Sequence, residues 1–267
     1  MKKYLSFFRM RFIAGLQYRA AAVAGIATQF VWGFMEILLF RAFYEADATA
    51  FPMSFEALAS YIWLQQAFLV LFMGWFLENE IFQSISDGSI AYELCRPVQI
   101  YPMLFSRSTA NRLSKAVLRC LPILVIAAFL PRPYRLSLPV NAEAAFWFIV
   151  SMLFSFLIAV AFGMIIYIIT FYTISPLGLR IVVMNIVEFF SGGILPLPFF
   201  PDKIRQVVEL LPFASMQNIP LRIYSGDIMG DDILFRIGLQ FFWLAAIVLL
   251  GKSLMQKALR RVIVQGG

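Results

Sequence analysis

The chain has 267 residues, of which 61% are hydrophobic and 14% are charged, and its mean hydropathy is +0.82. Soluble domains have roughly 45–50% apolar and about 25% charged residues, so this composition predicts an integral membrane protein. At about 20 apolar residues for each membrane span, the length accommodates about six spans and excludes a large soluble domain. The net charge of +7 does not indicate a nucleic-acid partner, because the basic residues flank apolar segments and there favour contacts with lipid headgroups.

The N-terminal segment, residues 1–19, predicts a helix that lies at the membrane interface. Its basic residues alternate with phenylalanines and leucines, and it contains no acidic residue. Basic side chains of this kind extend toward the headgroups while their apolar neighbours enter the membrane. The basic residues are Lys2, Lys3, Arg9, Arg11 and Arg19.

The rest of the sequence predicts an all-α, single transmembrane domain over residues 1–267, with six spans. The third is the least apolar, because only residues 116–130 are mostly hydrophobic and the preceding half is polar. Arg112, Lys115 and Arg119 share one helical face there, which either anchors the protein to acidic lipids or lines a water-filled mouth. The spans are predicted at residues 20–43, 58–77, 108–130, 144–172, 181–200 and 234–254.

The distribution of charge predicts that both termini lie in the cytosol. Lysine and arginine gather in residues 1–19, between the second and third spans, and in residues 252–261, whereas most acidic residues fall in the loops on the other side. Cytosolic loops carry the excess of basic residues in membrane proteins. Residues 78–107 are therefore expected inside the cell.

Residues 79–97 form a polar segment between two apolar ones and predict a short amphipathic helix with a break. Ile81 and Ile85 supply an apolar face, Asp87 and Gly88 interrupt the helix, and a second short stretch follows. A cytosolic helix with an apolar face suits insertion into the groove of a partner protein. The second stretch contains Ile90 and Leu94 and ends at Arg96 and Pro97.

A second informative segment, residues 191–201, breaks the fifth predicted span. Gly192 and Gly193 permit unusual backbone angles, and Pro196 and Pro198 remove backbone donors. Such a segment either folds back into the membrane against protein or is a kinked helix end that leads into a loop. Beyond it, apolar residues recur with helical spacing from Ile204 and predict a short amphipathic helix on the outer surface.

Two acidic residues fall within predicted spans. Burying the ionised Glu188 side chain there costs free energy, so Glu188 is expected either to make a structural contact or to act on the substrate. Asn185 lies on the same helical face and is a candidate hydrogen-bond partner. Glu36 lies near the outer end of the first span, where its carboxylate is expected to reach water.

Several kinds of chemistry are excluded by the residues that the chain lacks. It has no histidine and no G-x-x-x-x-G-K-S/T phosphate-binding loop, so it has neither a histidine-based catalytic site nor an ATP site of that type. Cys95 and Cys120 are not expected to form a disulfide or, without histidine, a metal cluster.

The order of these elements resembles that of the permease subunits of type 2 ATP-binding-cassette (ABC) exporters, in particular short permeases of about 260 residues. The resemblance covers nearly the whole chain and rests on ISDGSIAYELCRP after the second span, on SGGILPLPFFP in the fifth, and on LLPF after it. It implies that a coupling helix within residues 78–107 docks on a separate ATPase subunit, and that residues 192–232 form an outer gate of short re-entrant helices. Carried over to this sequence, the coupling residues are Ile81, Ile85, Asp87, Gly88, Ile90, Leu94 and Arg96, and the gate residues are Gly192, Gly193, Pro196 and Pro198.

The resemblance further implies ATP and magnesium bound by the partner and no cofactor in this chain. It implies a second permease, identical or paralogous, and export of an amphiphile such as a drug, peptide or lipid. Two alternatives come from other classes of protein: a membrane-embedded enzyme that uses Glu188, and a scaffold or sensor subunit without transport activity.

Overall fold

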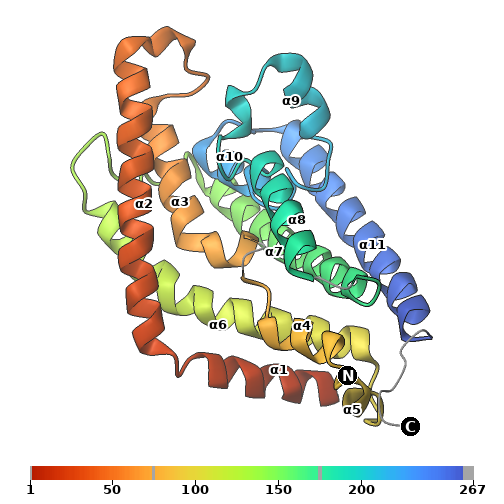
Figure 1. Ribbon diagram of the computed structural model, residues 1–267. Helices are drawn as coiled ribbons and strands as arrows, with labels where there is room; N and C mark the ends of the chain where they lie inside the picture. Colours follow the sequence, from red (N-terminus) through yellow and green to blue (C-terminus); the bar gives the residue numbers. More distant parts are fainter. Residues whose placement is uncertain (1, 74–75, 174–175, 261–267) are drawn as a thin grey trace.

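The computed structural model describes residues 2–73, 76–173 and 176–260, and every long element in these ranges is an α-helix (Figure 1). The all-α prediction is confirmed. Arg261, one of the C-terminal basic residues, lies outside the described ranges. In chain order the helices are α1 (Lys2–Gly15), α2 (Arg19–Ala46), η1 (Ala48–Ala50), α3 (Phe55–Phe72), α4 (Asn79–Ser86), α5 (Ile90–Leu94), α6 (Ile100–Ala128), α7 (Ala142–Thr170), α8 (Pro176–Phe190), η3 (Leu197–Phe199), α9 (Asp202–Val208), α10 (Asn218–Ser225) and α11 (Asp231–Leu259).

Four of the described helices, α2, α3, α7 and α11, are long and apolar enough to cross a membrane. The chain is therefore a multi-pass membrane protein, whereas the count of six spans stays a prediction. Helix α6 has 29 residues but a polar first half, and α8 has only 15, which gives about 22 Å against a hydrocarbon core of about 30 Å.

Three predicted spans match α2, α7 and α11 closely, whereas the helices nearest the other three predicted spans have different bounds. Helix α3 ends at Phe72, before residue 77, and helix α6 begins at Ile100, before residue 108. Helix α8, which is nearest the fifth predicted span, is displaced toward the N-terminus, because it ends at Phe190 and the glycines after it turn the chain.

The helices define two ends of the molecule, which Figure 1 shows at the bottom and the top. The proximal end holds α1, α4 and α5, and the distal end holds α9 and the connection from α2 to α3. Helix α1 lies along α6, where Gly15 packs on Ser114, and the Lys3 ammonium donates a hydrogen bond to the Pro97 carbonyl over 2.6 Å. The basic N-terminal helix thus supports the start of α6.

The core lies around α3 and α7, whereas α2 and α11 expose apolar side chains. Tyr61, Ile62 and Trp63 of α3 are fully buried, but Trp32 of α2 and Phe241 of α11 are exposed. An apolar exterior around a partly polar interior is what a lipid environment requires, because the hydrocarbon cannot hydrogen-bond. Helices α2 and α11 therefore present lipid-facing or partner-facing surfaces.

Candidate functional site

Helices α4 and α5 at the proximal end form the predicted amphipathic element, and the break between them is confirmed at Gly88. Gly88 has a φ of 77°, a backbone conformation that residues with a Cβ rarely adopt. The Asp87 carboxylate accepts a hydrogen bond from the backbone amide of Ser89 over 2.9 Å. Hydrogen bonds from Ser89 lower the pKa of Asp87, so this turn keeps a negative charge at the exposed tip.

The apolar face of α4 contacts the chain itself, so Ile81 and Ile85 do not present a free apolar surface to a partner, and the docking of this element on a partner stays a prediction. Ile81 and Ile90 are only 1% exposed, and Ile85 is also buried. The ring of Phe82 lies 4.9 Å from that of Tyr167 on α7. These side chains hold α4 and α5 to the body of the protein. The side chains left on the surface include Tyr92, which is 78% exposed, together with Leu94, Cys95 and Arg96.

Polar contacts connect α4 to three long helices. The backbone amide of Glu78 donates to the Tyr167 hydroxyl of α7 over 2.6 Å. Arg107 of α6 lies 2.7 Å from the Glu78 carboxylate and also pairs with Glu80. Arg180 of α8 donates to the Asn79 side-chain oxygen over 2.6 Å. A displacement of α4 therefore acts directly on α6, α7 and α8.

Sequence reasoning missed these anchoring residues, because Tyr167 and Arg180 are distant from α4 in the chain. One signal was present: Tyr167 is a tyrosine close to the end of an otherwise apolar helix, a position where a hydroxyl commonly finds a polar partner.

The basic face of α6 is divided between two environments, and Arg112 fits neither of its predicted roles. Arg112 is 2% exposed, and its guanidinium donates to the carbonyls of Leu71 and Met73, each over 3.1 Å. A cation is favourable at the C-terminal end of a helix, here that of α3. Arg119 instead approaches Gly25 of α2, and Lys115 stays half-buried. Of the three basic residues on this face of α6, only Lys115 and Arg119 remain candidates for contacts with lipid headgroups.

The second candidate element is the broken segment after α8. Gly192 has a φ of 84°, and its carbonyl oxygen lies 3.4 Å from both the Tyr61 hydroxyl and the Gln217 side-chain nitrogen. The Gly193 carbonyl accepts a hydrogen bond from Gln65 of α3 over 2.8 Å. Pro196 and Pro198 are buried. Because the freed carbonyls have protein partners and the prolines are covered, this packing favours a re-entrant segment over a helix end that leads into a surface loop.

Glu188 and Asn185 differ in environment although both lie on α8. Glu188 is half-buried, and its methylene group approaches Gly193. Asn185 is exposed, and its amide donates to the Ile181 carbonyl of the same helix over 2.7 Å. Glu36 does not reach water as expected, since its carboxylate accepts a hydrogen bond from Gln66 of α3 over 3.3 Å.

The segment between α8 and α11 contains a buried ionic network that sequence reasoning also missed. Arg222 of α10 pairs with Glu209 and with Asp227, and Arg236 of α11 lies 2.5 Å from the second Glu209 oxygen. Burial by itself would raise the pKa of Glu209, but the guanidinium groups of Arg222 and Arg236 outweigh it and lower that pKa. The network fixes α10, which is almost wholly buried, to the distal end of α11.

No cofactor site is evident among the residues that the structure describes. Within them, no three cysteine, aspartate or glutamate side chains gather where a metal ion would bind. The geometry supports a conformational role. Helices α4 and α5 are fixed to α6, α7 and α8, and the broken segment after α8 packs on α3.

A comparison with known protein families agrees with this structure of a multi-pass helical membrane protein. Residues 30–266 match the family described as ABC-2 family transporter protein. The chain therefore belongs to the ABC-2 transporter family and is a permease, the membrane component of an ABC transporter. A comparison with curated proteins found no match.

Proposed function

We propose that this permease belongs to an exporter, forms half of its translocation path, and is driven by ATPase subunits that dock on α4 and α5. ATP and magnesium are bound by those subunits, and this chain performs no bond chemistry. The proximal end faces the cytosol, and both termini are cytosolic. The observation that carries the proposal is the attachment of α4 to α6, α7 and α8 through Arg107, Tyr167 and Arg180.

The coupling surface consists of the exposed side chains of α5 and the residues after it. Closure of the ATPase dimer moves α4 and α5 together, because Ile81, Ile85 and Ile90 pack both helices on one core. The ion pair between Arg107 and Glu78 transmits the displacement to α6. Two packed arrangements of the long helices then expose the path alternately to either side.

At the distal end, the broken segment closes the path in this proposal. Gly192 and Gly193 are its gate residues together with Pro196 and Pro198, and they are attached to α3 through Tyr61 and Gln65. The chain has 29 phenylalanines, and a composition this rich in aromatic residues suits a path for an amphiphilic substrate such as a drug, peptide or lipid. A second permease, identical or paralogous, supplies the other half.

The coupling surface is tested by charge substitution of exposed side chains that have no packing role. In Tyr92→Glu and Leu94→Glu, we expect the ATPase to bind roughly tenfold more weakly, as for a central interface residue. ATP hydrolysis stimulated by the permease should fall in parallel. The matched control is Leu138→Glu on the α6–α7 connection, because Leu138 is 88% exposed but lies far from α4 in the chain.

The measurement is co-purification of the tagged permease, expressed together with its neighbouring genes, with any ATPase that those genes encode, followed by ATPase assays in lipid nanodiscs. Wild-type binding in both Tyr92→Glu and Leu94→Glu would place the coupling surface elsewhere. Failure of the wild-type chain to capture any ATPase would contradict the exporter proposal and favour a scaffold or sensor subunit.

A further inference from the structure

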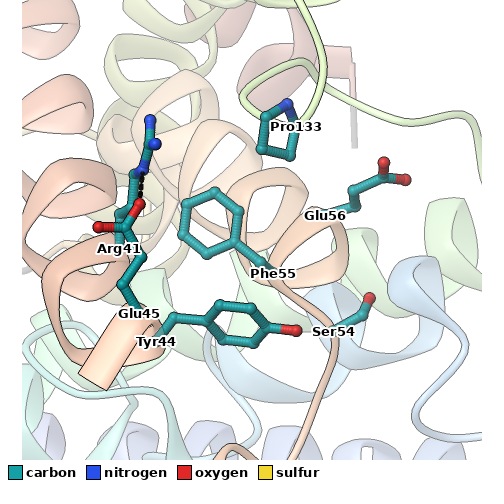
Figure 2. Close-up of a pocket in the computed structure, with 7 residues that line it drawn as sticks. All are labelled: Arg41, Tyr44, Glu45, Ser54, Phe55, Glu56 and Pro133. Carbon is teal, nitrogen blue, oxygen red and sulfur yellow. Dashed lines mark hydrogen bonds and ion pairs between the residues drawn. The ribbon is translucent and has the colours of Figure 1, made fainter. Parts of the chain in front are cut away.

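A cavity of about 430 Å³ opens between the end of α2, the start of α3 and the α6–α7 connection (Figure 2). Its volume lies within the roughly 300–1,000 Å³ typical of sites for small organic ligands. It belongs to the distal half of the molecule and shares no residue with the coupling surface or with the broken segment after α8. Nothing in the proposed transport cycle uses it.

Aromatic side chains form the floor of this cavity. Phe55 is 7% exposed and lies at the centre of the lining residues in Figure 2, and Tyr44 lies beside it with 5.5 Å between the ring centroids. Pro133 adds an apolar wall on another side. A floor of this kind binds apolar bodies and, through the negative faces of its rings, organic cations.

The charged groups of the lining lie on opposite sides of the Phe55 ring in Figure 2. On one side the Arg41 guanidinium pairs with Glu45 over 2.6 Å and also lies 5.2 Å from the centroid of the Tyr134 ring. On the other side Glu56 is exposed, and its carboxylate makes no hydrogen bond or ion pair with any residue that the structure describes. The only cation of the lining is therefore neutralised, and one carboxylate remains for a ligand. Arg132 precedes Pro133 but is not part of the lining.

We propose that this cavity binds hydrophobic organic cations, with the apolar body on Phe55 and Tyr44 and the positive charge toward Glu56. An anion of the same shape would meet the uncompensated carboxylate and no free cation, so the cavity discriminates by charge. If α4 and α5 face the cytosol as proposed above, this binding site opens on the opposite side of the membrane.

The test is equilibrium binding of radiolabelled tetraphenylphosphonium to the purified chain in nanodiscs of phosphatidylcholine. Tetraphenylborate, which has nearly the same shape and the opposite charge, is the matched probe. We expect saturable binding of the cation and none of the anion above the level of empty nanodiscs. Glu56→Gln should weaken cation binding about three- to fivefold, the effect of an exposed ion pair.

Two further variants separate the site from general effects of charge and lipid. Glu143→Gln, which removes an exposed carboxylate from the first turn of α7 as Glu56→Gln does from α3, should leave binding unchanged. Tyr44→Ala should weaken it severalfold, because the apolar body of the ligand loses one of its two aromatic contacts. Equal binding of both probes, or equal losses in Glu56→Gln and Glu143→Gln, would overturn the proposal. The assay uses the permease alone, so its result is independent of coupling to an ATPase.

Discussion

At the scale of single residues, the strongest departure from expectation is Arg112. Its spacing from Lys115 and Arg119 placed it on a basic face directed at lipid or water. In the structure the charge is buried and satisfies carbonyl groups that the end of α3 leaves without intrahelical partners. Helical spacing predicts which residues share a face, but it does not reveal what lies opposite that face.

Because Arg112 caps the C-terminal end of α3, we predict that Arg112→Met destabilises the protein. Loss of the guanidinium leaves the carbonyls of Leu71 and Met73 buried without donors, and hydrogen bonds to charged groups contribute about 1.5–3 kcal/mol. We expect a lower midpoint of thermal unfolding in detergent. Lys115→Met is the control, because this half-buried neighbour makes no hydrogen bond in the part of the chain described. Equal unfolding midpoints for the two variants would show that Arg112 does not stabilise α3.

At the scale of elements, hydropathy and turn-forming residues predicted the long helices and their breaks, whereas the partners of individual side chains could not be predicted. The apolar stretches of α2, α7 and α11 needed no tertiary information, and Gly88 and Gly192 marked two breaks correctly. The resemblance implied short helices within residues 192–232, but the position of α10 was not predicted, because it depends on contacts of Arg222 with residues before and after it in the sequence. Its amphipathic pattern is too short to be distinguished from a loop by periodicity alone.

The buried network around Glu209 predicts a dependence of stability on pH. Its lowered pKa means that the ionised form is favoured in the folded state, so its contribution is complete above the ordinary glutamate pKa and is lost as the pH falls through the lowered value. At pH 7, Glu209→Gln should destabilise the protein by about 3 kcal/mol, because Arg236 loses its carboxylate partner and the buried Arg222 keeps only Asp227. Thermal unfolding of wild type and variant should converge as the pH falls below about 4.

The control for this network is an exposed ion pair in the same segment. Asp202 lies 2.7 Å from Arg205 at the surface, so Asp202→Asn should cost less than about 1 kcal/mol at any pH. A difference between wild type and Glu209→Gln that stays constant from pH 7 to pH 3.5 would contradict the linkage to Glu209.

At the scale of the whole molecule, α8 presents an exposed apolar face that the rest of the chain does not cover. Leu177, Val182, Ile186 and Phe189 form an exposed apolar face, and Asn185 lies among them. A polar side chain on a lipid-facing surface is expensive, and asparagine commonly contributes to contacts between membrane helices. The predicted second permease therefore has a specific place to bind, which the sequence alone did not indicate because it does not show which face of α8 is covered.

We predict that two permeases meet along this face of α8. In a chain with Cys95→Ser and Cys120→Ser, the single substitutions Val182→Cys and Ile186→Cys should give an oxidative crosslink of doubled mass in membranes. Phe241→Cys and Leu249→Cys, on the exposed face of α11, are the controls and should not crosslink. A crosslink in the chain expressed alone identifies a homodimer, whereas one that requires a co-expressed second permease with a cysteine at the matching position identifies a paralogous pair. Crosslinks only from α11, or from neither helix under both conditions of expression, would refute α8 as the interface, and Asn185 would then need another partner.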